Sequence, residues 1–461
     1  MPKLPEDFKE KYIRLLGKSR AEEFFDSIND RPKSAFRINS LKENYCVSYE
    51  QEKEVSGVSK AYYGKINGQD PAWVSGAVYS QEPTAMFPAL FLKACPGQKI
   101  LDLCAAPGGK STAISEQLKG EGLLVANEIS HSRAKVLREN LERWGTTNSL
   151  IVSEKPEKLA QCFPHYFDKI LVDAPCSGEG MFRKNPQAID YWSQNYVLLC
   201  QKRQKEILNA AVKMLKPEGE IVYSTCTYSP EENEQIVSWL TKKFNLTIMP
   251  LDIKTRSIDH GHPEWADNNP DLIKTVRFWP TAELGEGQFA AKLKLSPQVE
   301  VQGKISTNQK AKKKSKFQKE SLNKAEIQLI AEVLDKFNLP AAIKNWRLNS
   351  QVHNNHAFIP ALTISANLHL QILSNGVELG LLKKNRFEPS HQLAMVLAEE
   401  KQNRVLELSN ENYLKHLHGE ALRTESNETG FVLVSYQNFI LGFGKISNHI
   451  IKNYYPKGLR V

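Results

Sequence analysis

The stretch DLCAAPGGKSTA, residues 102–113, stands where an apolar run gives way to a helical pattern. KILDLCAA (99–106) predicts a strand, and KSTAISEQL (110–118) predicts the start of a helix. Gly108 and Gly109 allow a tight bend and a close approach of the backbone to a ligand. In a doubly wound sheet, ligands bind at such a strand-to-helix turn. The stretch therefore predicts an α/β domain with a ligand site at its first turn.

The residues after this turn keep the same alternation of strands and helices. The strands are near-continuous apolar runs, as expected when helices cover both faces of a sheet. The alternation implies a doubly wound, mainly parallel sheet. We expect 286–295 to close this sheet as an edge strand. The other predicted strands are 122–128, 149–153, 168–174 and 220–226, and the predicted helices are 132–145 and about 197–215.

The flanking segments have other patterns and suggest further domains. The N-terminal segment predicts a helix over 5–17 and a strand within RPKSAFRINSLK (31–42). Near the C-terminus, alternating apolar residues flank Gln437 and Asn438, which predict a hairpin turn. The expected domains are 1–75 (α+β), 76–296 (α/β), 297–322 (basic linker), 323–385 (small C-terminal domain) and 386–461 (β-rich).

Composition narrows the class of protein. The chain has 461 residues, 41% of them apolar, which argues for several folded domains and against global disorder. Its net charge of +9 fits either plain solubility or a polyanionic partner. Seven cysteines without a CxxC pair predict neither a disulfide framework nor a metal site. A charged N-terminus and the lack of an apolar run of roughly 18 residues predict a cytoplasmic protein with no membrane helix.

The glycine turn indicates the kind of ligand. Its sequence is neither GxGxxG nor GxxxxGK[ST], which disfavours a dinucleotide pyrophosphate and a P-loop. Glu128 ends the second predicted strand, 19 residues after Gly109, where a carboxylate can accept both hydroxyls of a ribose. A nucleoside-type cofactor fits this arrangement, and S-adenosylmethionine is the commonest one.

Two cysteines follow the next strand ends. Cys176 lies in ILVDAPCSGEG (170–180) and Cys226 in IVYSTCTYSPEENE (221–234). Because parallel strands end at the same edge of a sheet, both cysteines and Asp173 should face the cofactor crevice. We expect the helix after Cys226 to begin with Ser229 as its N-cap and Pro230 as its first residue. Cys104 should line the site passively, and the remaining cysteines should be small buried hydrophobes: Cys46, Cys95, Cys162 and Cys200.

Two thiols and a carboxylate beside a methyl donor suit one reaction. Addition of a thiolate to C6 of a cytosine makes C5 nucleophilic, and a carboxylic acid near N3 stabilises the charge that develops on the ring. After methyl transfer, a second group must assist loss of the C5 proton so that the first thiolate can leave. The residues alone do not rank Cys176 and Cys226 for these two roles.

These motifs resemble a known family. LDLCAAPGGKS, the pair at 127–128, DAPCSGEGMFRK and YSTCTYSPEENE are similar to motifs of the RNA cytosine-C5 methyltransferases related to Nol1/Nop2/Sun proteins. GFGK and IKNYYPKGLR near the C-terminus resemble the PUA-like tail of the bacterial RsmF/YebU branch. The resemblance implies a Rossmann-like class I methyltransferase core, a PUA-like β-rich domain and S-adenosylmethionine as cofactor.

The resemblance also implies residue roles. Cys226 would be the nucleophile, Cys176 would assist release, and Asp173, with Lys110 nearby, would stabilise cytosine N3. Where many relatives carry an aspartate near the adenine, this chain has Ser153 and Glu154, so that contact stays open. The implied cofactor-binding residues are Cys104, Ala105, Ala106, Pro107, Gly108, Gly109, Lys110, Glu128, Arg133 and Asp173.

The expected partner is RNA. Arg37, in the segment that the family lays beside its RNA, and Arg183 with Lys184, directly after Cys176, are the predicted RNA contacts. The RsmF/YebU branch modifies 16S ribosomal RNA near the decoding site, which makes that RNA or the small subunit the expected substrate of a monomeric enzyme. The alternatives are the same chemistry on transfer RNA, a non-catalytic RNA-binding ribosome assembly factor, and an NAD-dependent oxidoreductase, which the absent GxGxxG disfavours.

Overall fold

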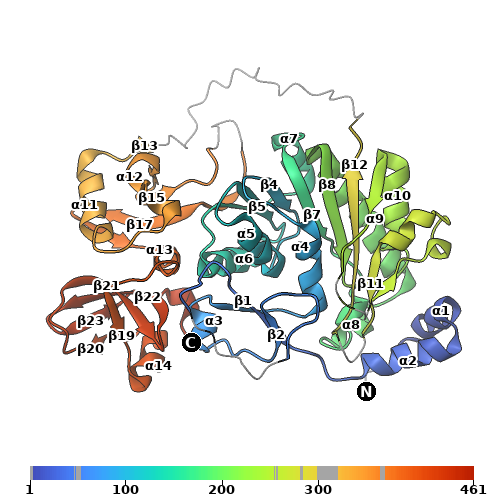
Figure 1. The fold of residues 1–461 in the computed structure, drawn as a ribbon, viewed down its shortest axis with the longest axis horizontal. Coiled ribbons are helices and arrows are strands. Elements are labelled where there is room, and N and C mark those ends of the chain that lie inside the picture. The colour runs from blue at the N-terminus through green and yellow to red at the C-terminus, as the bar shows by residue number, and fades with distance from the viewer. Residues whose placement is uncertain are drawn as a thin grey trace.

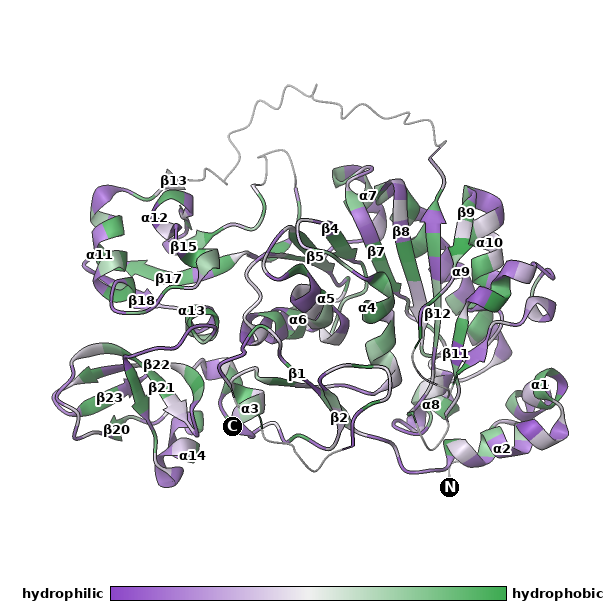
Figure 2. Cartoon of the chain, viewed as in Figure 1, coloured by the Kyte–Doolittle hydropathy of each residue, from purple (hydrophilic) through white to green (hydrophobic). Residues whose placement is uncertain are grey.

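The computed structural model describes residues 4–45, 47, 53–253, 255, 258–280, 284–297, 320–363 and 369–461. Its elements form an N-terminal unit, a large central sheet and two smaller C-terminal sheets (Figure 1). Green, apolar residues concentrate on the central strands and on the helix faces beside them (Figure 2). Within the described residues, no helix combines the length and the apolar character that a membrane span requires.

The N-terminal unit begins with two helices, α1 (Glu6–Leu16) and α2 (Lys18–Ile28). Gly17, with φ of 77°, separates them, and its N–H donates to the carbonyl of Ile13. A three-stranded antiparallel sheet follows, in the order β2-β1-β3. Its third strand lies beyond the boundary expected at residue 75, and the second helix was not expected. The elements are β1 (Ala35–Ile38), β2 (Ala61–Tyr63), α3 (Pro71–Val74) and β3 (Val78–Ser80).

The central sheet has the strand order β10-β11-β12-β8-β7-β4-β5-β6-β16. The five strands β8-β7-β4-β5-β6 are parallel, which confirms the expected doubly wound sheet. These strands are β4 (Lys99–Asp102), β5 (Leu123–Asn127), β6 (Ser149–Val152), β7 (Phe167–Asp173) and β8 (Leu215–Thr225).

Helices cover both faces of this sheet and bury two apolar layers. The helices on one face are α4 (Phe87–Leu92), α5 (Gly109–Leu118) and α6 (His131–Trp144), and those on the other face are α7 (Pro156–Cys162), α9 (Gln194–Met214) and α10 (Glu234–Phe244). The short helices of this part are α8 (Gln187–Asp190), η1 (Thr84–Met86), η2 (Glu179–Met181), η3 (Pro263–Trp265) and η4 (Pro270–Lys274).

Two ends of the central sheet differ from expectation. The strand expected at the edge, β12 (Gln288–Leu295), lies inside the sheet, because it pairs with β8 on one side and with β9 and β11 on the other. At the opposite edge, β16 (Ile372–Asn375) pairs antiparallel with β6. A strand from the C-terminal half therefore completes the central sheet. The added strands are β9 (Leu246–Met249), β10 (Asp259–His260) and β11 (Val276–Phe278).

The first C-terminal sheet has the order β13-β14-β15-β17-β18. Most of the expected linker, residues 298–319, lies outside the described residues. The elements of this part are β13 (Glu320–Ser321), α11 (Lys324–Leu334), η5 (Ala341–Ile343), α12 (Trp346–Asn349), β14 (Gln351–His353), β15 (His356–Ile359), β17 (Val377–Lys383), β18 (Arg386–Pro389) and α13 (His391–Leu397).

The last sheet, with the order β19-β21-β22-β23-β20, confirms the expected β-rich C-terminal domain. Gln437 and Asn438 have φ of 52° and 67°, so they form the expected tight hairpin turn between β21 and β22. The elements are β19 (Val405–Glu407), α14 (Asn410–His418), β20 (Leu422–Arg423), β21 (Gly430–Tyr436), β22 (Phe439–Ser447), β23 (Ile450–Asn453) and η6 (Lys457–Leu459).

Candidate active site

The glycine turn lies where it was expected, between β4 and α5. Gly108 has φ of 119°, a conformation that residues with a side chain rarely adopt. A Cβ on Gly109 would lie 3.0 Å from side-chain atoms of Tyr79 and Gln81. Gly108 is thus favoured by its backbone conformation and Gly109 by the closeness of its neighbours.

A carboxylate that the sequence reasoning did not select stands at the start of this turn. Asp102 is fully buried, and its Oδ2 accepts a hydrogen bond of 2.6 Å from Ser111 Oγ. Its Oδ1 is buried without a hydrogen-bond partner. Burial raises the pKa of Asp102 to about 7. The signal was its place as the last residue of the strand before the glycine turn.

Glu128 and Arg133 lie beside the glycine turn. Glu128 directly follows β5, is 3% exposed, and accepts a hydrogen bond of 2.9 Å from the N–H of Ser130. Arg133 lies 3.2 Å from the Glu128 carboxylate and donates to the carbonyl of Ala106 at 2.8 Å. Arg133 therefore joins the carboxylate at the second strand end to the glycine turn.

The two residues left open after the third strand have different surroundings. The carboxylate of Glu154 accepts from Lys158 Nζ and from the N–H of Gln371, both at 2.6 Å. Ser153 keeps its hydroxyl 3.4 Å from the carbonyl of Ile129, next to Glu128. The segment that leads into β16 thus holds the Glu154 carboxylate, whereas the Ser153 hydroxyl stays near the residue after Glu128.

The two predicted cysteines come together. Cys176 follows β7 and Cys226 follows β8, and these parallel strands are in register, with Asp173 opposite Ser224. The two Sγ atoms lie 3.3 Å apart. A side-chain hydrogen bond to Cys226, burial and the negative charge of Glu232 raise the pKa of Cys176 well above that of a free thiol. Cys176 therefore retains its proton at neutral pH.

Asp173 lies beside the thiols and is held by three groups. Lys110 Nζ donates to its Oδ2 at 2.7 Å. Ser224 Oγ and Gln288 Nε2 donate to its Oδ1 at 2.7 and 3.1 Å. Burial lowers the pKa of Lys110, but the charge and hydrogen bond of Asp173 outweigh that effect and raise it. Lys110 and Asp173 thus form an ion pair at the end of β7, opposite Ser224 of β8.

The residues after the two cysteines are also joined. Ser177 Oγ lies 2.8 Å from Thr227 Oγ1. Glu232 accepts from the N–H of Ser177 at 3.0 Å and from Gln204 Nε2 at 2.7 Å, and it also accepts from Ser177 Oγ. Burial raises the pKa of Glu232 to about 7. Glu232, which sequence reasoning did not select, therefore fixes the loop that carries Cys176.

A second buried carboxylate, Glu179, fixes the loop that carries Cys226. It accepts from the N–H of Tyr228 at 3.0 Å and from Ser229 Oγ at 2.6 Å. Tyr12 OH and Trp192 Nε1 donate to the same carboxylate at 2.5 and 2.8 Å. Because Tyr12 belongs to α1, this N-terminal helix helps to hold the loop that carries Cys226.

The segment after Cys226 does not form the expected helix start. α10 begins at Glu234, and its N-cap residue Asn233 makes no side-chain cap bond. Ser229 instead donates to Glu179 and accepts from Lys11 Nζ at 2.8 Å. The prediction of Ser229 as N-cap was wrong because tertiary partners take up its hydroxyl.

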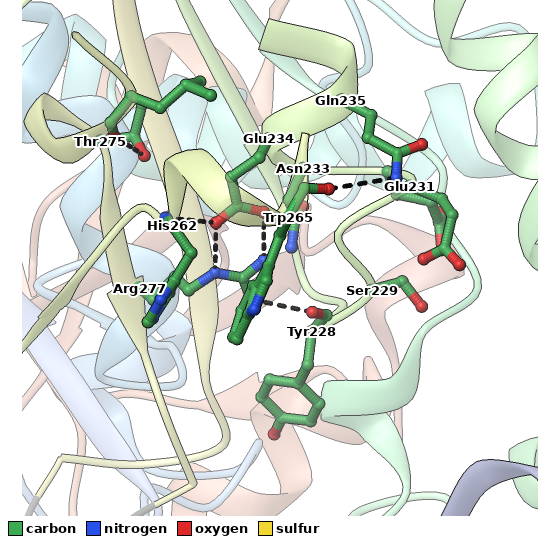
Figure 3. A network of polar contacts seen from close by, with 12 residues as sticks. Tyr228, Ser229, Glu231, Asn233, Glu234, Gln235, His262, Trp265, Thr275 and Arg277 are labelled. Carbon is green, nitrogen blue, oxygen red and sulfur yellow. Dashed lines mark hydrogen bonds and ion pairs between the residues drawn. The ribbon is translucent and has the colours of Figure 1, made fainter. Parts of the chain in front are cut away.

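An ion pair between Glu234 and Arg277 closes this network (Figure 3). Arg277 Nε donates to Glu234 Oε1 at 2.6 Å, and its NH1 donates to the carbonyl of Tyr228 at 2.8 Å. The pair is fully buried, so removing one partner would leave an uncompensated charge, which typically costs about 3–5 kcal/mol. The run from Tyr228 to Glu234 is thus a scaffold for the thiol loop.

The prediction of Arg37 as an RNA contact does not fit the structure. Arg37 is 5% exposed. Its guanidinium donates to Glu116 at 2.5 Å, to Gln81 at 3.0 Å, and to the carbonyl of Gly109 at 2.7 Å and Thr112 Oγ1 at 2.6 Å. The hydrogen bonds of this guanidinium are therefore taken up by protein groups, and they link β1 to the first turn of α5.

Arg183 differs from expectation for the same reason. It is 9% exposed and donates to the carbonyls of Ser27 and Pro280, the latter at 2.9 Å. Glu286 lies 3.5 Å from its Nε. Only Lys184, of the three predicted RNA contacts, is exposed.

The other cysteines also differ among themselves. Cys200 is buried as expected, whereas Cys95 is exposed and Cys162 is half-buried. Burial raises the pKa of Cys104, which keeps that thiol protonated beside the turn. Cys46 lies outside the described residues. Within the described part of the chain, no group of three or more His, Cys, Asp or Glu side chains is arranged to hold a metal ion.

Comparisons with known proteins agree with this geometry. A model of the 16S rRNA methyltransferase RsmB/F family matches residues 89–294. The chain is 31% identical to ribosomal RNA small subunit methyltransferase F of Vibrio vulnificus strain YJ016, over 99% of this chain and 97% of that protein. The chain belongs to the RsmB/F methyltransferase family. Models of three further RsmF domains also match this chain. The model of the RsmF N-terminal domain matches residues 4–83, that of the first C-terminal domain matches 336–397, and that of the PUA domain matches 403–461.

Other relatives give the same result. The Pectobacterium atrosepticum protein of the same name is 32% identical over 84% of this chain and 78% of its own. A methyltransferase homologue from Pyrococcus horikoshii, whose structure is solved, has 26% identity and a TM-score of 0.55 over 63% of this chain and 95% of its own. NSun6 from the same organism, solved with SFG, is 22% identical with a TM-score of 0.54, covering 63% of this chain and 98% of that one, and shows the shared fold.

The residues at the turn fit S-adenosylmethionine, the methyl donor of this family. The unpartnered Oδ1 of Asp102 is a buried acceptor, which a ligand N–H would satisfy. Glu128 offers a carboxylate at the second strand end, where a ribose is bound in doubly wound sheets. Gly108 and Gly109 leave the backbone bare where a Cβ would crowd its neighbours.

Proposed function

We propose that this methyltransferase of the RsmB/F family methylates C5 of a cytosine in 16S ribosomal RNA through a covalent adduct between Cys226 and C6 of the base. The observation that carries the proposal is the pair of Sγ atoms 3.3 Å apart beside the Lys110–Asp173 ion pair. The name of the relatives, ribosomal RNA small subunit methyltransferase F, supports the choice of RNA.

The cofactor would be held by the glycine turn and by the carboxylates at the first two strand ends. S-adenosylmethionine supplies the methyl group when it is bound. The backbone from Cys104 to Lys110 would line the cofactor, the unpartnered Oδ1 of Asp102 would accept a hydrogen bond from it, and Glu128 would bind the ribose. Arg133 keeps Glu128 in position through its bond to Ala106.

Cys226 is the group that we assign to attack on C6. The resemblance to the family assigns the attack to Cys226, and the raised pKa of Cys176 agrees with it, because that thiol keeps its proton 3.3 Å from the attacking sulfur. Addition of Cys226 as a thiolate to C6 places negative charge on the ring. The Lys110–Asp173 pair, at the same strand edge, stabilises that charge at N3.

Cys176 is the group that we assign to the release step. Once the methyl group is on C5, the C5 proton must be lost before the C6–S bond can break. A water that the Cys176 thiol positions can accept that proton. Loss of the proton then expels Cys226 as a thiolate and restores the aromatic ring.

The target base must leave its stack to reach these thiols. A 16S transcript labelled with tritium at C5 of its cytosines tests the chemistry directly. We expect one tritium released to water for each methyl group incorporated from labelled cofactor. Methyl incorporation without tritium release would place the methyl group on another atom and overturn the proposal.

The same assay separates the alternatives. Transfer RNA transcripts labelled in the same way should release no tritium, and preferred release from them would redirect the enzyme to transfer RNA. A non-catalytic assembly factor would release none from either RNA. Bisulfite mapping of both RNAs from a deletion strain would then identify the cytosine.

A further inference from the structure

The N-terminal half of α9 exposes apolar side chains beside the candidate site. Leu198 is 46% exposed and Leu199 is 61% exposed, on a helix that buries Val197 and Cys200. Tyr191, three residues before α9, is 78% exposed. Large apolar side chains gathered on a surface commonly mark an interaction site.

Two hydrogen bonds hold this surface against the thiol loops. Gln204 of α9 donates to the carbonyl of Pro175, the residue before Cys176, at 3.1 Å. Trp192 donates to Glu179 at 2.8 Å, and Glu179 in turn binds the N–H of Tyr228 at 3.0 Å. Tyr191 therefore directly precedes a residue, Trp192, that is bound to the carboxylate holding the Cys226 loop.

Tyr196 shares one face of α9 with two of the exposed side chains. Tyr196, Leu199 and Arg203 are spaced by three and four residues, so they lie on one face of α9. Arg203 directly precedes Gln204, whose side chain donates to the carbonyl of Pro175 next to Cys176, so this part of α9 lies beside the loop that carries Cys176.

The charges of this surface suit a polyanion. Basic residues outnumber acidic ones among its exposed side chains: Lys184, Lys202 and Arg203 against Asp190 and Glu206. Proteins that bind single strands combine cations for the phosphates with aromatic rings for the bases, because every base has a face that can stack. The exposed Tyr191 supplies such a ring and the exposed Arg203 such a cation.

We propose that Tyr191, Leu199 and Arg203 form a rim that binds the unpaired nucleotide next to the target cytosine. The Tyr191 ring stacks on the neighbouring base, Leu199 covers its edge, and Arg203 contacts a phosphate. The inference rests on the proposed RNA substrate and adds to it a contact surface outside the thiol site and the cofactor turn.

Two variants with matched controls test the rim. Tyr191→Ala and Arg203→Gln alter exposed side chains, and Leu348→Ala (86% exposed in α12) and Lys213→Gln (exposed at the far end of α9) are their controls. The probe is an unmethylated 16S rRNA transcript, titrated at several salt concentrations. We expect Tyr191→Ala to weaken RNA affinity about tenfold, as the loss of one stacking partner does. Arg203→Gln should reduce the log–log salt slope by about 0.7, the value for one phosphate on a single strand.

The controls and a second probe make the result decisive. Both control variants should bind the transcript as the unaltered protein does, and all four variants should bind S-adenosylhomocysteine unchanged. With 4-thiouridine in the transcript, photo-cross-links should map to peptides within residues 187–203. Normal RNA affinity of both rim variants, or cross-links of these peptides to ribosomal proteins alone in small subunits, would overturn the rim. Tritium release by the unaltered protein reports separately on the proposed chemistry, so the two can fail independently.

Discussion

The hydroxyl of Ser177 lies 2.8 Å from the hydroxyl of Thr227, so the residues that follow the two cysteines are joined side chain to side chain. The same Ser177 is bound through its N–H and its hydroxyl by the buried carboxylate of Glu232. The separation of the two thiols therefore depends on a carboxylate that has no direct bond to either of them.

Glu232→Gln should lower the rate of methylation without changing cofactor affinity. The amide NH2 of the glutamine would face a hydrogen-bond donor of Ser177 or of Gln204, so one of these hydrogen bonds would be lost. Leaving a buried polar group without its partner typically costs about 1–3 kcal/mol of stability. We expect a fall in single-turnover rate of about tenfold or more, measured with saturating RNA and cofactor. Glu206→Gln, an exposed carboxylate on α9, is the control and should react normally. An unaltered rate for Glu232→Gln would mean that the thiol loops hold their places without it.

Arg37→Met should weaken cofactor binding and leave RNA binding unchanged. The substitution removes the guanidinium that holds the carbonyl of Gly109 and the side chain of Thr112, so the glycine turn loses its support. Calorimetry with S-adenosylhomocysteine should show a dissociation constant raised about tenfold, consistent with loss of charge-assisted hydrogen bonds worth roughly 1.5–3 kcal/mol. Arg31→Met, exposed in the same segment, should bind the cofactor normally. A reduced salt slope for RNA with normal cofactor affinity would instead restore Arg37 as an RNA contact.

The fold was predictable from local patterns because the central strands are continuous apolar runs and the glycine turn lies between a predicted strand and a predicted helix. The proximity of the two cysteines was predictable for a similar reason, since register brings the ends of parallel strands together. Arg37 and Arg183 were misjudged because a basic residue in an alternating strand or a loop looks the same whether it meets phosphate or buried carbonyls. Ser229 had the pattern of an N-cap, but Glu179 and Lys11, distant in sequence, took up its hydroxyl.

Contacts between distant segments account for the other differences. β12 was expected at an edge because its partners β9 and β11 are short strands in a segment with weak periodicity. β16 was expected in a separate domain, yet it pairs with β6 across more than two hundred residues. Glu232 and Asp102 were missed because their importance comes from burial, which a single sequence does not show.

His391 should make the protein less stable as the pH falls below about 6.5. Both of its ring nitrogens are buried without a hydrogen-bond partner. Burial lowers its pKa to about 3, and the nearby charges of Lys42, His416 and Arg143 add to the effect. In the unfolded chain a histidine has a pKa of about 6.5, so only the unfolded chain takes up a proton between these values.

The stability that neutral His391 provides is thus fully present above pH 6.5 and is lost progressively toward pH 3. Linkage gives a loss of about 2 kcal/mol between pH 7 and pH 5. Hydrogen exchange of α13 amides at the two pH values measures it. His391→Leu should reduce this pH dependence, whereas His418→Leu, at an exposed position, should retain it. Equal pH dependence in all three proteins would contradict the assignment.

The roles of the two cysteines are the central claim, and a denaturing gel tests them most directly. Cys176→Ser, incubated with 16S rRNA transcript and S-adenosylmethionine, should accumulate a protein–RNA band that survives denaturation, because attack occurs and release fails. Cys226→Ser and the double variant should give no such band and no methylated RNA. A covalent band from Cys226→Ser, with the cross-link mapped to Cys176, would reverse the roles and contradict the account.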